Sequence, residues 1–210
     1  ISVSIVLILY ILSILFEKDI SGLFIRELNK KLKTTVRAEE LNFSLLQRFP
    51  QASIELKNVL IESPLMKNNK PGAPDTLVYA DNIILSLEIT RLIRKDYSID
   101  RIDINKGIIN IYRNADGHYN TDIIQVAGDS LSTDIELNVN NFNIINSSIT
   151  YKASDSDLRF SAIIENSSNK LSLSKKNTGI RTKSDLLLTT LTTGPGHSIN
   201  ESLNVSLKSD

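Results

Sequence analysis

The spacing of hydrophobic residues divides this chain into three regions. Residues 1–16 are almost entirely apolar, residues 17–33 repeat apolar side chains every three or four positions, and from Thr34 onward apolar and polar side chains alternate. A period near 3.6 is typical of an amphipathic helix, and a period of two is typical of a strand with one buried face. We therefore predict a mainly β protein with an N-terminal helix and a curved antiparallel sheet that is apolar on one side.

The apolar segment 1–16 carries no charged side chain, and we predict a single transmembrane anchor there. As a helix it would span about 24 Å at about 1.5 Å per residue, which is short of the ~30 Å hydrocarbon core of a bilayer. The chain begins with Ile1 and stops at Asp210 within a strand pattern, so we expect a segment of a longer protein and a truncated anchor. A signal-peptide hydrophobic region and a buried helix are the alternatives.

The next segment, 17–33, predicts an amphipathic helix with basic residues opposite its apolar stripe. Those basic residues would place the flank in the cytoplasm by the positive-inside rule, but charges before Ile1 could outweigh them, so the sequence does not decide the topology. The stripe comprises Ile20, Leu23, Phe24, Leu28 and Leu32. Either the end of a sheet or a membrane interface would cover this stripe.

Two short repeats of alternating residues predict β-hairpins. In the first, alternating strands flank the turn-forming residues Asn105, Lys106 and Gly107. In the second, 40 residues later, the predicted turn begins at Asn146. Asn and Gly are frequent in tight turns because they tolerate left-handed backbone conformations. We predict a first β domain over 34–126 and a continuation of the same sheet over 127–210, joined by a polar linker at 127–133.

A sheet with one apolar face must bury that face against something. Either the sheet folds over into a sandwich, or it curves into an open groove whose apolar floor meets hydrocarbon chains. The groove would be lined by the inward aliphatic positions of the strands, which are Ile54, Leu56, Ile83, Leu85, Leu87, Ile102, Ile104, Ile109, Ile111, Leu137 and Val139.

Composition narrows the possible functions. The chain has 24 basic and 24 acidic residues, so it lacks the basic field of a nucleic-acid-binding protein. It has no cysteine, and its two histidines, His118 and His197, have no second histidine nearby for a metal site. No arrangement of nucleophile, base or paired carboxylates stands out. We predict no enzymatic activity, no metal and no cofactor.

Several stretches in their order resemble the N-terminal part of the AsmA family. They are residues 49–59 (FPQASIELKNV), 75–80 (DTLVYA), the basic turn 91–95, residues 99–102 (IDRI), 109–111, and Asp116-Gly117 with Asn120. Together with the apolar start and the amphipathic helix they cover residues 1–151. The likeness extends to TamB and to chorein-type proteins, which have a β-groove that carries phospholipid between membranes.

This resemblance implies a protein anchored in the bacterial inner membrane with its body in the periplasm. Its groove would carry phospholipid acyl chains toward the outer membrane and serve outer-membrane biogenesis. The alternative is a non-enzymatic scaffold that affects targeting or insertion of outer-membrane proteins, with sheet edges that recruit envelope partners by strand addition.

Overall fold

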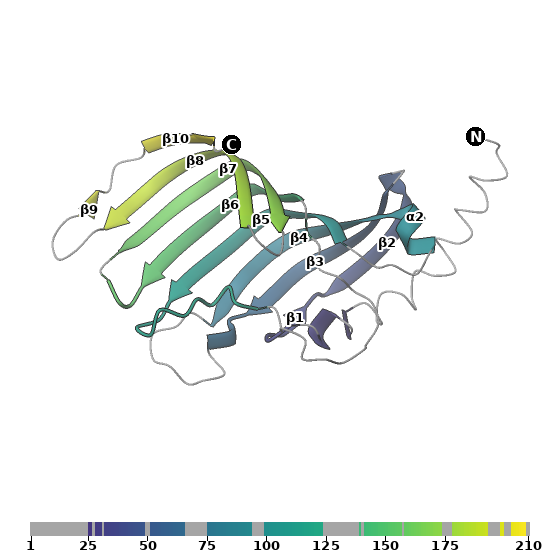
Figure 1. The fold of residues 1–210 in the computed structure, drawn as a ribbon, viewed down its shortest axis with the longest axis horizontal. Coiled ribbons are helices and arrows are strands. Elements are labelled where there is room, and N and C mark those ends of the chain that lie inside the picture. The colour runs from purple at the N-terminus through teal and green to yellow at the C-terminus, as the bar shows by residue number, and fades with distance from the viewer. Residues whose placement is uncertain are drawn as a thin grey trace.

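In the computed structural model, the residues that can be described are 25–26, 28–30, 32–48, 51–65, 75–93, 99–123, 139, 141–156, 158–173, 178–192, 198–199 and 203–208. They form a curved, open sheet (Figure 1), so the predicted mainly β fold is confirmed. The predicted anchor, 1–16, lies outside these residues. Among the described residues, no helix combines the length and the apolar character needed to cross a membrane.

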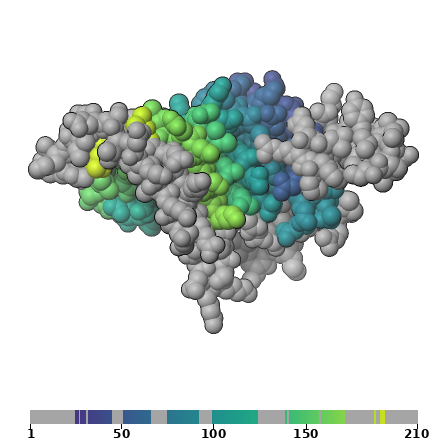
Figure 2. Space-filling view, turned by 90° about the horizontal axis from the view of Figure 1, so that it is seen from above, coloured from purple at the N-terminus to yellow at the C-terminus, as the bar shows by residue number. Residues whose placement is uncertain are grey.

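The sheet contains ten strands and follows the order β1-β3-β4-β5-β6-β7-β8-β10, with β2 beside β3 and β9 beside β8. The described segments cross the surface in this succession, from blue through teal to green (Figure 2). The strands are β1 (Val36–Arg37), β2 (Glu40–Arg48), β3 (Gln51–Glu62), β4 (Thr76–Glu88), β5 (Ile99–Arg113), β6 (Asn141–Ala153), β7 (Arg159–Leu173), β8 (Thr178–Thr192), β9 (Ser198–Ile199) and β10 (Leu203–Lys208). A short helix, α2 (Ile89–Ile93), follows β4. The described strands form one sheet, so the sandwich alternative is not supported.

One strand pair departs from the predicted antiparallel pattern. Strands β5 and β6 run parallel, with Ile104 beside Ile144 and Ile109 beside Ile149. A parallel neighbour needs a crossover connection of a dozen or more residues, and the long segment between Arg113 and Asn141 provides the length for one. The 40-residue repeat in the sequence therefore corresponds to two strands that lie side by side in register.

The two predicted hairpins are wrong. Strand β5 continues through Lys106 and Gly107, and β6 continues through Asn146, so each predicted pair of strands is one long strand. Lys106 and Asn146 have φ angles of 50° and 47°. The left-handed tolerance that makes asparagine common in turns here allows a local break in a continuous strand.

These breaks belong to a line that crosses five strands, which we call the crease. On each strand from β3 to β7, two buried positions near the crease lie three residues apart instead of two, so the inward face changes register by one residue. The pairs are Leu56 and Val59, Ala80 and Ile83, Ile104 and Gly107, Ile144 and Ser147, and Ile164 and Ser167. Strand pairing aligns them across the sheet.

Gly107 occupies a tight place in the crease. A Cβ atom there would lie 2.8 Å from Cγ2 of Ile104 and 3.2 Å from Oγ of Ser147. The Gly107 N–H instead donates a hydrogen bond of 2.8 Å to that serine hydroxyl. The crease therefore requires a residue without a side chain on β5 and a small hydrogen-bonding residue on β6.

The inner face of the sheet forms the hydrophobic core, and helical residues near the N-terminus lie against it. Residues 25–26 and 28–30 are helical, Leu28 and Leu32 are buried in the core, and Arg26 and Lys30 are exposed. The Asn29 side chain accepts a hydrogen bond of 2.8 Å from the Val36 N–H and donates one of 3.1 Å to its carbonyl. The described part of the predicted amphipathic helix thus has the expected apolar side, which covers one end of the sheet.

Candidate apolar binding site

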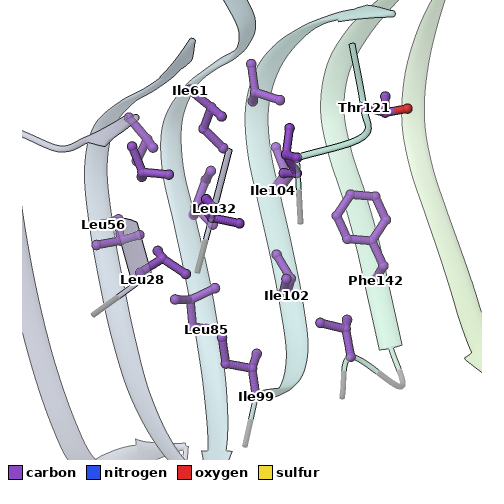
Figure 3. A pocket seen from close by; sticks show the side chains of 16 residues that line it. Leu28, Leu32, Leu56, Ile61, Leu85, Ile99, Ile102, Ile104, Thr121 and Phe142 are labelled. Atoms are coloured by element: carbon purple, nitrogen blue, oxygen red, sulfur yellow. The ribbon is translucent and has the colours of Figure 1, made fainter. Parts of the chain in front are cut away.

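The inner face of the sheet contains an apolar cavity of about 500 Å³. Its volume lies within the range of pockets that bind small organic ligands. Strands β1, β3, β4, β5 and β6 contribute most of the described lining, and Leu28, Leu32, Val139 and residues 121–123 contribute the rest (Figure 3). The lining residues are Leu28, Leu32, Val36, Leu56, Val59, Ile61, Val78, Ile83, Leu85, Ile99, Ile102, Ile104, Thr121, Ile123, Val139 and Phe142.

The two ends of the cavity differ in their exposure to solvent. At the β3 and β4 end, Leu56 and Leu85 are buried beneath Leu28. At the β5 and β6 end, Ile102 and Phe142 are only half-buried. Thr121 and Ile123 on that side are exposed and half-buried, respectively. The lining is therefore more exposed beside Ile102, Phe142, Thr121 and Ile123 than beside Leu56 and Leu85, and we call this more exposed side the open end.

A short connection holds the open end beside the helical segment. The backbone N–H of Lys33 donates a hydrogen bond of 2.7 Å to the carbonyl of Ile123. The Lys33 side chain also forms an ion pair with Asp122, with 2.9 Å between Nζ and Oδ2. This contact joins the end of the predicted amphipathic segment 17–33 to the connection after β5, so the cavity has a fixed rim at this point.

The chemistry of the lining is that of a hydrocarbon-binding surface. The sixteen described side chains of this lining include no ionisable group, and Thr121 provides a hydroxyl at the rim. Apolar contact has no strong directional requirement, whereas fixed orientation of a ligand needs placed polar groups. The cavity can therefore accept a flexible apolar chain in more than one position along its length.

Six of the predicted groove residues line this cavity: Leu56, Ile83, Leu85, Ile102, Ile104 and Val139. Ile54, Leu87 and Ile109 are buried in the same core but do not line it, and Ile111 packs against that core. Leu137 lies outside the described residues.

Ten of the described lining residues were not predicted as part of the groove. Leu28 and Leu32 were on the predicted helical stripe, so their period of 3.6 could have indicated contact with the floor. Val59 lies three residues after Leu56 on β3, so it does not fit the alternation of every second residue that the prediction followed. Thr121 and Ile123 lie in a connection after β5 and have no periodic signal, so only the three-dimensional structure places them at the rim.

Ionisable groups with displaced pKa values lie away from the cavity. The pKa of Arg113 is raised by hydrogen bonds to Tyr119 and Asp155, and burial raises the pKa of Tyr151. The pKa of Lys57 is raised by its hydrogen bond to Glu40. These interactions join neighbouring strands and the turn after β5, where the Asn120 side chain caps the Tyr112 N–H at 2.8 Å. Arg113, Tyr151 and Lys57 therefore interact with other parts of the sheet, and none of the three lines the cavity.

Neither the described side chains nor comparisons with known proteins identify a reaction or a cofactor. Within the described residues, no group of three His, Cys, Asp or Glu side chains is arranged to hold a metal ion. A scan against models of known protein families finds no match, and a search of curated proteins finds no relative. The resemblance to the AsmA family therefore stays a prediction from the residues quoted above.

Proposed function

We propose that the cavity binds the acyl chain of a phospholipid. The observation that carries this proposal is a largely aliphatic space of about 500 Å³ on the inner face of an open sheet, with its more exposed lining residues on the side of the open end. Each methylene group moved from water into such a space contributes about 0.8 kcal/mol. The lipid headgroup would remain at the open end, beside Thr121 and the Lys33–Asp122 ion pair.

The wider role that we propose is transport of phospholipid between membranes of the bacterial envelope. A sheet that is open along one face suits a ligand that slides, because few polar groups would fix its position. The predicted anchor at 1–16 and the resemblance to the AsmA family favour an inner-membrane protein with its body in the periplasm. The protein would then support outer-membrane biogenesis without catalysing a reaction.

Extraction of lipid from the purified chain tests this proposal. Mass spectrometry should find about one phospholipid per chain in the wild type. Thr121→Trp should plug the open end and lower the lipid content several-fold, because the residue is exposed at the rim and a larger side chain there need not disturb the core. Leu85→Asp combined with Ile104→Asp should remove lipid by placing charge on the cavity floor.

Thr150→Trp provides the matched control, since Thr150 is exposed on β6 and does not line the cavity. This variant should retain wild-type lipid. Absence of lipid from the wild type, or equal lipid in the Thr121→Trp and wild-type proteins, would exclude the cavity as an acyl-chain site.

The edge strand β2 supports a second candidate function, a scaffold for envelope proteins. Strand β2 pairs with β3 along one side, and no described strand pairs with its other side. An unpaired strand edge can bind an extended segment of another protein through backbone hydrogen bonds. A proline at Asn42, within β2, should weaken binding of such a partner while leaving the lipid content unchanged.

A further inference from the structure

The outer face of the sheet has a row of five apolar residues and one serine that the lipid-binding proposal does not use. Strand pairing places Leu60 beside Tyr79, Tyr79 beside Ile108, and Ile108 beside Ser148. It continues from Ser148 to Ile163 and from there to Leu187. Directly paired residues point to the same face of a sheet. We call these six residues, one from each strand from β3 to β8, the outer row.

Solvent exposure makes the outer row unusual. Tyr79 is 39% exposed, Ile108 51% and Ile163 45%. They are three of the four large apolar side chains that are exposed among the described residues. Single exposed apolar residues are normal, whereas an apolar patch of a few hundred Å² on a protein surface is often functional.

Polar residues border the outer row along the crease. The adjacent outward positions on β3 to β7 are Asn58, Asp81, Lys106, Asn146 and Glu165. Asp81 and Lys106 form an ion pair with 3.7 Å between their charged atoms, so this border carries no excess of positive charge. A surface that binds anionic membrane normally has a basic border. The charge pattern therefore favours a protein partner over a lipid surface.

The size of the outer row indicates what kind of protein partner would fit. Three half-exposed side chains and their neighbours offer apolar area on the order of 300 Å². A stable dimer buries about 800 Å² on each partner, so two copies of this chain would need much more contact than the row offers. A single amphipathic helix matches the row better, because it presents one narrow apolar stripe.

The dimensions of the outer row agree with a helix. From Leu60 to Leu187 the row crosses five strand spacings of about 4.8 Å, or roughly 24 Å. A helix of that length contains about 16 residues, and its apolar stripe repeats every 5.4 Å, close to the strand spacing. Successive turns of the helix could therefore contact successive strands.

We propose that the outer row is a docking site for an amphipathic helix of a partner protein, about 16 residues long and close to neutral in charge. The helix would lie across β3 to β8 on the face opposite the lipid cavity. Its apolar stripe would cover Tyr79, Ile108 and Ile163, and its polar side would face the crease border and solvent.

A designed peptide tests this site on the full 210-residue chain in mild detergent. The probe is a fluorescent 16-residue helix of Leu, Glu and Lys with leucines at i, i+4, i+7, i+11 and i+14 and no net charge. Fluorescence anisotropy should show saturable binding. Ile108→Thr and Ile163→Thr should each weaken binding about tenfold, because each removes apolar contact while keeping a β-branched residue suited to a strand.

Two controls make the test specific. Ile84→Thr is the same change at a half-buried outward position across the crease, and it should leave peptide binding unchanged. A peptide of identical composition whose leucines alternate with polar residues should not bind. The lipid content of all these variants should match the wild type, so a failure here is separable from a failure of the lipid-binding proposal.

Four results would overturn the proposal. They are no saturable binding, equal binding of the two peptides, equal affinity of the wild type and the Ile108→Thr variant, and loss of binding in the Ile84→Thr control. Analytical ultracentrifugation and flotation with phosphatidylcholine vesicles test the other occupants. A dimer or vesicle binding that Ile108→Thr abolishes would assign the row to a second copy or to a membrane instead.

Discussion

The inner face of the sheet differs between its two ends. Across β3, β4 and β5, one row beside the crease consists of Leu56, Ile83 and Ile104, and it borders the cavity. The same row continues through Ile144 on β6 and reaches Ser167 on β7. At that end the Asn169 side chain donates hydrogen bonds of 3.0 Å to the Ser167 hydroxyl and to the Phe142 carbonyl.

This contrast shows what a one-sided sheet needs in order to enclose an apolar space. Both ends share the crease, the strand spacing and the curvature of one continuous sheet. The cavity occurs where the row is aliphatic and where Leu28 and Leu32 cover it, and its lining ends at Phe142, where inward polar side chains begin. Side-chain type and the cover by Leu28 and Leu32, rather than strand topology, therefore determine where the apolar cavity forms.

The largest difference between the two ends should appear in their contribution to stability. Leu56→Ala should lower the free energy of unfolding by about 2–5 kcal/mol, because it removes buried aliphatic contact. Ser167→Ala, in the same row at the other end, should cost no more than about 1.5 kcal/mol. Urea denaturation measures both. Equal losses would contradict the view that the apolar core is concentrated at the β3 to β5 end.

The crease should tolerate added volume differently on β5 and β7. Gly107→Ala should cost about 1–3 kcal/mol, because the new methyl group would contact Ile104 within the covered region. Ile164 occupies the corresponding row on β7, so space for a large side chain exists there. Lys106→Gly should be neutral or slightly stabilising, since it relieves a positive φ angle. A neutral Gly107→Ala variant would show that the crease is looser than described.

Ser147 lies between the two ends and should have an intermediate effect. Ser147→Ala removes the acceptor of the Gly107 N–H and should cost about 1 kcal/mol or somewhat more. Hydrogen exchange at the Gly107 amide should accelerate in the variant. Ser148→Ala, its neighbour on the outer face, is the matched control and should leave that exchange rate unchanged.

The smallest effect should come from the ion pair on the outer side of the crease. Asp81 and Lys106 are about half-exposed or more, so Asp81→Asn should change stability by less than about 0.5 kcal/mol. The same substitution should leave lipid content unchanged at both low and high salt. A large loss of stability would mean that the outer side of the crease, and not its inner rows, holds the strands in register.

The alternation of residues was sufficient to predict a one-sided sheet and the inward positions of its first strands. Leu56, Ile83 and Leu85 were placed correctly because their strands alternate regularly up to the crease. The local sequence around Lys106 and Gly107 is equally compatible with a turn and with a break inside a strand, since both can place a residue, here Lys106, at a positive φ angle and both can require the small size of glycine. Only pairing with β4 and β6 along the whole of β5 separates these alternatives.

Part of the candidate site could be predicted from the sequence because the strands that form its floor alternate regularly. Aliphatic floor residues have a periodic signal, whereas contact between Lys33 and Ile123 depends on how a distant connection folds back. The parallel pairing of β5 and β6 also required the structure, because a repeat of similar segments does not specify their direction. The resemblance to a lipid-transport family supplied an expected ligand, but the cavity supplies the physical basis on which that expectation can be tested.

Photocrosslinking tests the central claim most directly. The chain is loaded with a phosphatidylcholine that carries a diazirine in one acyl chain, irradiated, digested and sequenced by mass spectrometry. We predict adducts on the inner face at Ile102, Ile104 and Phe142, and their loss in Thr121→Trp. Adducts confined to outer-face residues such as Ile108, or no adduct on the chain, would contradict binding of acyl chains in the cavity.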